Sequence, residues 1–399
     1  MYKFYCRSFQ KVMRMSLNYL PWRDPRLVFG ENALMELPEI LKKEDLTRLL
    51  LVTDQGVVKA GLLDTFLHQL KRFGIEVILY SETVPNPTID NIETALMLYK
   101  TNNCQGIIAF GGGSPIDCAK AVAARVARPN KTIPQMRGLL KVVKKIPPLI
   151  AVPTTAGTGS EATLAAVVSN PKTKEKYALM DTALIPHIVV LDPLLTINLP
   201  KQITAATGMD ALTHAVEAYI GGSNTKETER WSIEAVKLIF SNLQLAYNEP
   251  SNVQARKNMQ VAAYFAGKAF TRAYVGNVHA IAHTFSAFYN IPHGLANAVL
   301  LPVTLDYYGE AAYKRLAELA DAVRITNKGD SDEVKAKTFI EKIDQLNRAM
   351  QIPESIEGIE IKDLPQMAKQ ALKEANPLYP VPQIFDQNDM MNVIRLVQA

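Results

Sequence analysis

Residues 104–120 read CQGIIAFGGGSPIDCAK, and this stretch decides the expected fold of the first half of the chain. An apolar run of strand length is followed by three glycines and by a helical pattern that we expect to extend from Pro115 to about Ala127. Ser114 is placed to cap this helix, and Asp117 stands where a capping box has an acid. The stretch therefore predicts a strand, a tight glycine turn and a helix.

The glycine turn could hold a phosphate group. Gly111, Gly112 and Gly113 allow backbone N–H groups to approach an anion, and the start of a helix favours negative charge. A tight turn without a ligand is the alternative, because the pattern matches neither common phosphate-binding glycine motif. The next apolar run ends in a similar loop, VPTTAGTGSE at 152–161. Donor-rich loops at the carboxyl ends of two neighbouring parallel strands favour nucleotide binding.

The alternation of strands and helices extends over most of the first half. Strand-like runs at 46–54, 75–82 and 188–193 alternate with helical patterns at 61–74 and 89–103. This order is typical of βαβ units, in which helices cover both faces of a parallel sheet.

The pattern changes after residue 199. From Ile203 onward the chain consists of long helical patterns without a convincing strand. At 399 residues the chain suits two domains better than one. We therefore predict an α/β domain with a parallel sheet over residues 1–199 and an all-α domain over residues 200–399.

Composition argues against several classes of function. The chain is 48% hydrophobic and 21% charged, as globular proteins are, and its apolar runs are shorter than a membrane span. Its net charge of +5 is spread out, so we expect neither membrane insertion nor nucleic-acid binding. Three cysteines without a CxxC pattern favour a reducing compartment. The basic segment 1–16 lacks most features of a transit peptide, which is the alternative, and we expect a cytoplasmic protein.

Histidines recur at helical spacing in the second half. Asp210 and His214 stand four residues apart, His279 and His283 repeat this spacing, and His293 follows in a loop-like segment. Residues four apart lie on one face of a helix. A carboxylate and several imidazoles that converge from two helices suit Fe²⁺ or Zn²⁺. The alternative is a set of structural histidines, each with a local hydrogen bond.

Four parts of the chain resemble the signature segments of the iron-dependent (group III) alcohol dehydrogenase family. They are GGGSPIDCAK (111–120), PTTAGTGSE (153–161), GMDALTHAVEAY (208–219) and VHAIAH with IPHGLANAVLLP (278–302). The resemblance implies a dinucleotide-binding α/β domain followed by a helical domain. It also implies reversible hydride transfer between NAD(H) and a small primary alcohol or aldehyde.

By this resemblance, one divalent metal ion is held by Asp210, His214, His279 and His293. The ion is expected to be Fe²⁺, with Zn²⁺ as the alternative, and to act as a Lewis acid toward the substrate oxygen. His283 is implied to lie near the nicotinamide and to carry protons rather than to bind the metal.

The resemblance also implies which residues contact NAD. They are Asp54, Asn86, Gly111, Gly112, Gly113, Ser114, Asp117, Thr154, Thr155, Thr158 and Lys176. Asp54 ends the run LLLVTD, where a carboxylate can accept hydrogen bonds from the adenosine ribose and disfavour NADP(H). A turn-forming aspartate is the alternative role for Asp54, and a surface charge is the alternative for Lys176.

Three residues are expected to shape the substrate pocket, namely Phe270, Arg272 and Ala165. Phe270 keeps the aromatic wall of the family, whereas Arg272 and Tyr274 are bulkier than the usual residues. If Arg272 faces the pocket, it favours substrates with an anionic group. A surface arginine is the alternative.

Two other functions stay open at this point. A lyase resembling dehydroquinate synthase shares the expected fold and uses NAD transiently, but the DALTHA and PHGLANA segments argue against it. A metal-binding protein without enzymatic activity is disfavoured by the glycine turn beside the metal pattern. We also expect a homodimer or a higher homo-oligomer.

Overall fold

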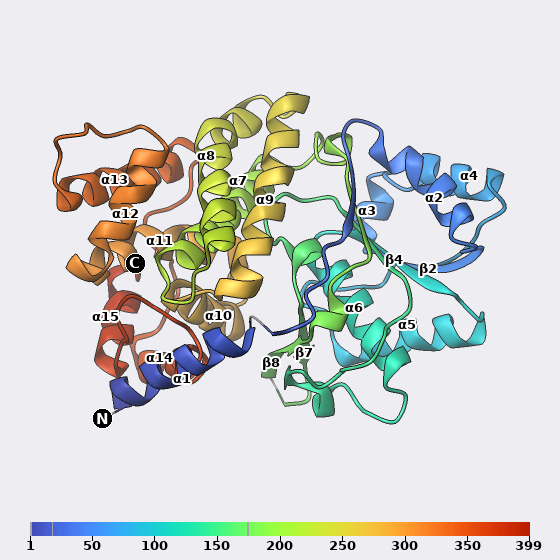
Figure 1. The fold of residues 1–399 in the computed structure, drawn as a ribbon, viewed down its shortest axis with the longest axis horizontal. Helices are drawn as coiled ribbons and strands as arrows, with labels where there is room; N and C mark the ends of the chain where they lie inside the picture. The colour runs from blue at the N-terminus through green and yellow to red at the C-terminus, as the bar shows by residue number, and fades with distance from the viewer. Residues whose placement is uncertain (1, 18, 174) are drawn as a thin grey trace. The chain divides into compact units, whose positions relative to one another are not determined.

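The computed structural model describes residues 2–17, 19–173 and 175–399, and the chain divides into two compact units (Figure 1). The α/β unit comprises Pro21–Asn198, and the helical unit comprises Leu199–Ala399 together with the start of the chain up to Leu20. The sequence division places all of residues 1–199 in the α/β domain, whereas α1 (Tyr2–Leu17) packs within the helical unit.

The α/β unit is built on a six-stranded parallel sheet with the strand order β1-β9-β6-β4-β2-β3. Its strands are β1 (Arg26–Phe29), β2 (Arg48–Val52), β3 (Glu76–Tyr80), β4 (Gly106–Gly111), β6 (Leu149–Pro153) and β9 (Ile188–Leu191). In the middle of the sheet, Ile108 of β4 lies opposite Leu51 of β2 and Ile150 of β6. The parallel sheet predicted from the alternating sequence pattern is confirmed.

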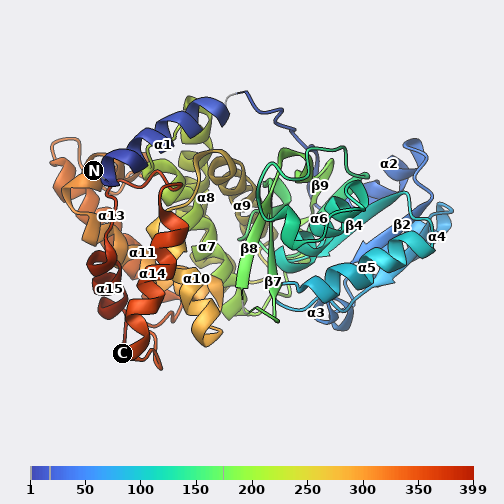
Figure 2. The same ribbon diagram turned by 90° about the horizontal axis from the view of Figure 1, so that it is seen from below.

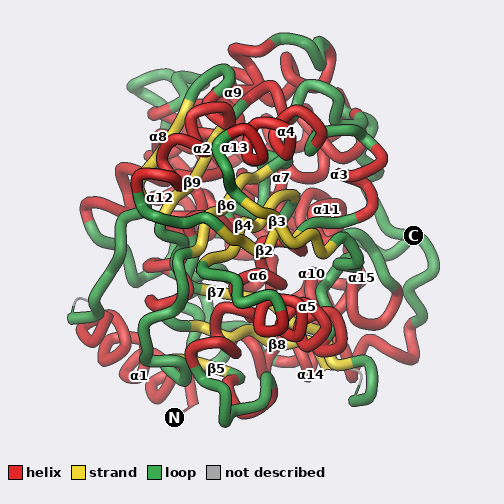
Figure 3. Tube along the Cα trace, turned by 90° about the vertical axis from the view of Figure 1, so that its right-hand side faces the viewer, coloured by secondary structure: helices red, strands yellow, loops and turns green. Residues whose placement is uncertain are grey.

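Helices cover both faces of this sheet. They are α2 (Leu37–Lys43), α3 (Gln55–Lys59), α4 (Asp64–Arg72), α5 (Ile89–Thr101) and α6 (Gly113–Ala127). Successive strand residues point to opposite faces. Leu49 and Leu51 of β2 therefore join the core under α2 and α4, whereas Leu50 and Val52 join the core under α5 and α6. Figure 3 shows α2 and α4 on one side of the strands and α5 and α6 on the other.

This unit also contains a second, three-stranded sheet that the sequence pattern does not predict. Its order is β5-β8-β7, with β5 (Gly138–Leu139), β7 (Ala165–Asn170) and β8 (Glu175–Met180). β7 and β8 are antiparallel, and their buried residues alternate along each strand, as in a hairpin with one covered face. Short 3-10 helices complete the unit: η1 (Ala33–Glu36), η2 (Pro134–Met136), η3 (Ser160–Ala162), η4 (Thr182–Leu184) and η5 (Pro193–Leu195).

The helix after the glycine turn begins earlier than the sequence predicts. α6 starts at Gly113 with Gly112 as its N-cap, so the predicted cap at Ser114 and capping box at Asp117 are wrong. The glycines themselves make the change of direction, because Gly111 has a φ of 148°, a conformation that side chains disfavour.

Lys120 lies one turn beyond the glycine turn and is completely buried. Its Nζ donates to the carbonyl of Ser160 (2.6 Å), to the carbonyl and hydroxyl of Thr163 (2.7 and 2.9 Å) and to the carbonyl of Ala165 (2.8 Å). Burial lowers the pKa of Lys120 to about 8. Because polar acceptors surround the ammonium group, this lysine ties α6 to the segment that enters β7 and does not extend toward a ligand.

The helical unit consists of helices and their connections. They are α1, α7 (Lys201–Ile220), α8 (Lys226–Asn248), α9 (Val253–Ala273), α10 (Asn277–Tyr289), α11 (His293–Tyr308), α12 (Glu310–Ala322), α13 (Asp332–Ala349), η6 (Ile361–Asp363), α14 (Leu364–Ala375) and α15 (Gln387–Leu396). α7 is buried from Gly208 to Ile220, as a helix surrounded by others must be. α8 and α9 pack along it (Figure 2), and a side chain on Gly208 would collide with Leu243 of α8.

α1 packs on a late segment of the chain within the helical unit. Cys6 is buried with Val381 and Ile384. Arg7 donates to the carbonyl of Val381 at 2.7 Å, and Gln10 donates to the carbonyl of Tyr379 at 2.7 Å. Across the described residues, none of the helices has the length and apolar character needed to cross a membrane.

Candidate functional site

Two glycines let two further helices approach α7. Gly276 precedes α10, and a Cβ there would lie 2.6 Å from Oε1 of Glu217. Gly294 is the second residue of α11, and a Cβ there would collide with the backbone carbonyl of Ala206. Because both side chains are absent, α10 and α11 begin in contact with α7. The histidines at the start of both helices are thereby brought to the polar positions of α7.

A carboxylate and two imidazoles converge at this place. Oδ1 of Asp210 lies 3.8 Å from Nε2 of His279 and 3.5 Å from Nε2 of His293, and one ligand atom from each residue lies within 4.8 Å of the others. Asp210 and His279 are each 2% exposed, and His293 is half-buried. Ligand atoms that share one tetrahedral metal ion at about 2.1 Å stand about 3.4 Å apart, so these distances fit a single ion.

Asn297, one turn after His293 on α11, lies at the same point. Its Nδ2 donates to Oδ1 of Asp210 at 2.7 Å and lies 3.2 Å from Nε2 of both His279 and His293. An amide N–H group bonds to a ring nitrogen through the lone pair of that nitrogen. The amide has two N–H groups and one of them goes to Asp210, so at most one ring nitrogen can accept from it at a time, but both Nε2 atoms lie beside the same location. Asn297 stands in the PHGLANA segment but is not among the predicted site residues, because an amide is not a usual ligand for such metals.

His214, the fourth predicted ligand, lies against this cluster. Its ring stacks on the ring of His279, with 4.4 Å between centroids and 25° between planes. On its other side lies Phe270, at 4.1 Å and 13°. The group of converging ligand atoms does not include His214, so its role as a ligand stays a prediction.

On α10, Nδ1 of each histidine lies within hydrogen-bond distance of a carboxylate. Nδ1 of His279 lies 2.6 Å from Oε2 of Glu217 on α7, and Nδ1 of His283 lies 2.6 Å from Oε1 of Glu374 on α14. Burial by itself would lower the pKa of His279, but the hydrogen bond and charge of Glu217 raise that pKa above its ordinary value. Neither carboxylate was singled out from the sequence, because nothing in their spacing links them to these histidines.

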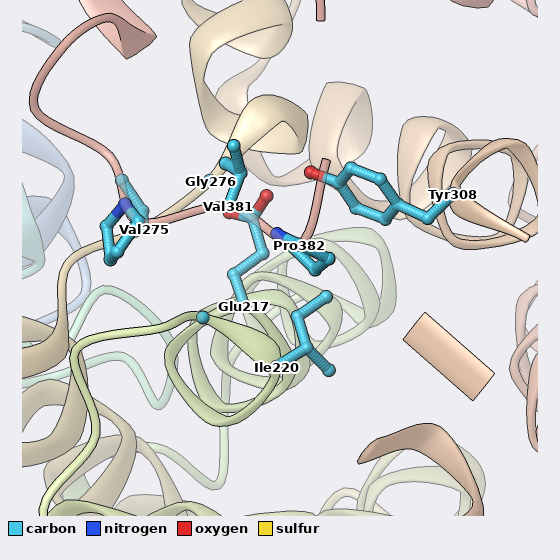
Figure 4. Close-up of a pocket in the computed structure, with 9 residues that line it drawn as sticks. Glu217, Ile220, Val275, Gly276, Tyr308, Val381 and Pro382 are labelled. Atoms are coloured by element: carbon cyan, nitrogen blue, oxygen red, sulfur yellow. The ribbon is translucent and has the colours of Figure 1, made fainter. Parts of the chain in front are cut away.

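Glu217 lies among apolar neighbours and is 3% exposed. The small pocket beside it is lined by Ile220, Gly221, Val275, Gly276, Tyr308, Pro380, Val381 and Pro382. Figure 4 shows the side chain rising from α7 toward Gly276. Among the residues that the structure describes, its ion-pair partner is His279. Two buried carboxylates, those of Asp210 and Glu217, leave a negative charge that a divalent cation would balance, so the residues fit a metal ion.

Within the α/β unit, loops that follow β2, β4 and β6 meet at the carboxyl edge of the sheet. A Cβ on Gly111 would lie 3.3 Å from Oδ2 of Asp54, which follows β2. A Cβ on Gly113 would lie 2.9 Å from Cγ2 of Thr158, which follows β6. The direction of strand addition reverses between β2 and β4, since β3 is added on one side and β4 on the other. In open α/β sheets such a switch point is where nucleotides bind.

Other predicted nucleotide contacts surround the same turn. The backbone N–H of Asn86 donates to Oγ of Ser114 at 3.1 Å. A Cβ on Gly112 would lie 3.4 Å from the side chain of Thr155. Thr154 is buried, and its backbone N–H donates to the last carbonyl of β4. The structure therefore brings these residues together in one loop cluster.

Two predicted nucleotide contacts have partners inside the protein. Asp117 accepts hydrogen bonds from Oγ of Ser160 at 2.6 Å and from the backbone N–H of Val167 at 3.1 Å. Burial raises the pKa of Asp117, while the charges of Lys120 and Lys176 act in the opposite direction. Contact of Asp117 or Lys176 with NAD stays a prediction, and the bonds of Asp117 favour a structural role.

Arg272, one of the predicted pocket residues, is held on the helical unit by two neighbours. Its Nη1 lies 2.7 Å from Oε2 of Glu227, and its guanidinium lies 4.9 Å from the centroid of the Trp231 ring. These contacts hold the guanidinium of Arg272, which is 19% exposed, on the helical unit, and recognition of an anionic substrate by Arg272 stays a prediction. Ala165 is the first residue of β7, where its carbonyl accepts a hydrogen bond from Lys120.

Known proteins resemble this chain over most of its length. The profile of a family described as iron-containing alcohol dehydrogenase matches residues 24–193. The profile described as the C-terminal part of the Fe-containing alcohol dehydrogenase family matches residues 204–397. A 1,3-propanediol dehydrogenase of Klebsiella pneumoniae is 39% identical over 352 residues, which cover 87% of this chain and 91% of the relative.

Solved structures of similar proteins share the fold of both units. A crystal structure of 1,3-propanediol oxidoreductase has a TM-score of 0.90 at 36% identity, covering 95% of this chain and 99% of that one. The sulfoacetaldehyde reductase of Bifidobacterium kashiwanohense, solved in complex with NAD⁺, has a TM-score of 0.84 at 26% identity, covering 95% and 98%.

Changing His279 to alanine is expected to remove most of the bound metal ion and nearly all turnover, because it deletes a buried predicted ligand of the cluster. Elemental analysis of the dialysed variant would measure the metal content. The exposed His68 offers a matched control, since His68→Ala should keep its metal. Full metal occupancy in His279→Ala would show that the site is assigned wrongly.

Proposed function

Because this chain belongs to the iron-containing alcohol dehydrogenase family, and is therefore a metal-dependent oxidoreductase of alcohols and aldehydes, we propose that its substrates are small primary alcohols and aldehydes. We further propose Fe²⁺ as the metal and NAD(H) as the dinucleotide. The convergence of Asp210, His279 and His293 on one point carries the proposal. The lyase and non-enzymatic alternatives are dropped, because the family and its relatives are dehydrogenases and reductases.

Asp210, His279 and His293 would hold the metal ion, with His214 as the fourth predicted ligand. A divalent ion there supplies Lewis-acid chemistry toward the substrate oxygen, and NAD(H) supplies or accepts the hydride. Phe270 backs the ring of His214 and, as a rigid apolar wall, would limit the access of water to this side of the cluster.

His283 is the residue that we assign to proton transfer. Glu374 accepts the hydrogen bond of its Nδ1, so Nε2 is the ring nitrogen that can exchange a proton. Its ring stacks on that of His293, with 4.9 Å between centroids and 17° between planes. This contact supports a position of His283 next to the metal ligands.

The choice of NAD(H) is supported by Asp54 beside the glycine turn and by the related reductase that was solved with NAD⁺. The glycines would present backbone N–H groups to the diphosphate, and the hydroxyl groups of Thr155 and Thr158 lie against them. A homodimer or higher homo-oligomer and a cytoplasmic location are proposals that rest on the sequence analysis.

After chelation and reconstitution with Fe²⁺, the protein is expected to oxidise NADH in the presence of short aliphatic or hydroxylated aldehydes. Loss of NADH absorbance over a panel of such aldehydes would give kcat/KM for each, and the Zn²⁺-loaded protein serves for comparison. The chelated protein should be nearly inactive. If the Fe²⁺-loaded protein reduces none of the aldehydes, the proposed substrate class is wrong.

His283→Ala is expected to keep its metal ion but to lose ~10²–10⁴-fold in kcat, which is typical of a lost acid–base group. Metal analysis and steady-state kinetics on the same sample would separate these two effects. Loss of the metal ion from this variant would instead make His283 a ligand.

Asp54 is expected to set the preference for NAD(H) over NADP(H), because its carboxylate would repel a 2′-phosphate. It also caps α3 by accepting the N–H of Val57 at 3.0 Å. Asp54→Asn keeps a capping oxygen and removes the charge, whereas Asp54→Gly removes both. In both variants, the ratio of kcat/KM with NAD(H) to kcat/KM with NADP(H) should be smaller than in the unmodified protein. An unchanged ratio in both would limit Asp54 to the cap.

A further inference from the structure

Glu217 makes two hydrogen bonds to the first turn of α10. Its Oε1 accepts the backbone N–H of Val278 at 2.8 Å, and its Oε2 accepts from Nδ1 of His279 at 2.6 Å. A carboxylate whose two oxygens are both engaged has one fixed orientation. The side chain of His279 is therefore held by the same group that caps its helix.

The bond to Nδ1 determines which ring nitrogen of His279 can bind a metal ion. A proton on Nδ1 leaves Nε2 as the atom with a free lone pair. Nε2 lies 3.2 Å from Nδ2 of Asn297 and 3.8 Å from Oδ1 of Asp210, so the lone pair faces the point where the ligands converge.

We propose that Glu217 is a positioning residue of the metal centre, which fixes the tautomer and the ring orientation of His279 and thereby increases metal affinity. The inference rests on the proposed role of His279 as a metal ligand. A carboxylate on the outer nitrogen of a metal-binding histidine also makes the ring a stronger donor.

The surroundings of Glu217 strengthen this bond. Gly276 leaves room for Oε1, since a Cβ there would lie 2.6 Å away, and apolar residues such as Ile220 and Val381 line the adjoining pocket (Figure 4). Little water can compete for a carboxylate that is 3% exposed, so its hydrogen bonds are strong. Glu217 is thus a buried carboxylate with a fixed orientation, and it is hydrogen-bonded to the predicted metal ligand His279.

The chain offers two matched comparisons. Glu374 holds Nδ1 of His283 at the same distance of 2.6 Å, but His283 is not a predicted ligand. Asp386 caps α15 by accepting the N–H of Asp389 at 3.0 Å, with no histidine on its carboxylate. A change at Glu374 tests whether any carboxylate–histidine pair on α10 affects metal affinity. A change at Asp386 tests whether the loss of a helix cap is sufficient to lower metal affinity.

The experiment measures the affinity of the full chain for Zn²⁺ by competition with a fluorescent chelator. In the same side-chain orientation, Glu217→Gln turns its carbonyl oxygen to either Val278 or His279 and its NH₂ group, which cannot accept a hydrogen bond, to the other. Its Kd for Zn²⁺ should rise ~10–100-fold, as is typical when the outer partner of a ligand is lost. Glu374→Gln and Asp386→Ala, which removes the capping oxygen of α15, should bind Zn²⁺ as the unmodified protein does.

Three outcomes would overturn the inference. An unchanged Kd in Glu217→Gln, together with a lowered unfolding temperature, would make Glu217 only a helix cap. An equal rise of Kd in all three variants would mean that lost negative charge, and not positioning, weakens binding. Should Glu217→Gln fail to fold, Glu217→Asp keeps the charge but shortens the reach to His279, and unmodified affinity in that variant would also overturn the inference.

His279→Ala separates this inference from the proposed function. If that variant binds Zn²⁺ as the unmodified protein does, then the metal site itself is assigned wrongly. If that variant loses Zn²⁺ while Glu217→Gln does not, then the metal site stands and only the role of Glu217 is refuted.

Discussion

The packing of the helical unit depends on providing partners for two carboxylates that lie on a buried helix. Asp210 and Glu217 stand on α7, in the stretch that is buried on all sides. A buried carboxylate without a partner costs several kcal/mol, so partners must be brought to it. Gly276 and Gly294 make this possible, because their missing side chains let α10 and α11 begin against α7. The cluster of histidines is therefore also what makes an acidic α7 tolerable in the core.

The α/β unit shows a related constraint at the edge of its sheet. Strands covered on both faces must be apolar along their length, so polar groups gather where the strands end. Asp54 and the glycine turn lie together at this edge, at the switch point of the strand order. Lys120 shows that a polar residue near this edge can still belong to the fold, since its ammonium group is buried among backbone carbonyls.

The sequence predicted what depends on local pattern and missed what depends on tertiary partners. The parallel sheet, the helical second half and the family resemblance are confirmed, because apolar periodicity and motif order are properties of the sequence itself. The β7–β8 hairpin and the start of α6 at Gly113 escaped, since strand partners and glycine turns override local signals. Asn297 and Glu217 were not predicted, because each forms its hydrogen bond with a side chain on another helix.

His279 and His283 show how one spacing leads to two functions. They stand four residues apart on α10, and Nδ1 of each lies 2.6 Å from a carboxylate oxygen. Their side chains differ in exposure, at 2% for His279 and 27% for His283. A ring sealed from water cannot exchange protons quickly with solvent but keeps its lone pair for a metal ion, whereas a ring with access to water can exchange protons. Burial therefore distinguishes the two histidines of α10, but it does not mark ligands in general, since the predicted ligand His293 is 28% exposed. His293 is instead marked by its Nε2, which lies 3.5 Å from Oδ1 of Asp210, and a sequence motif that lists each residue as histidine cannot express these differences.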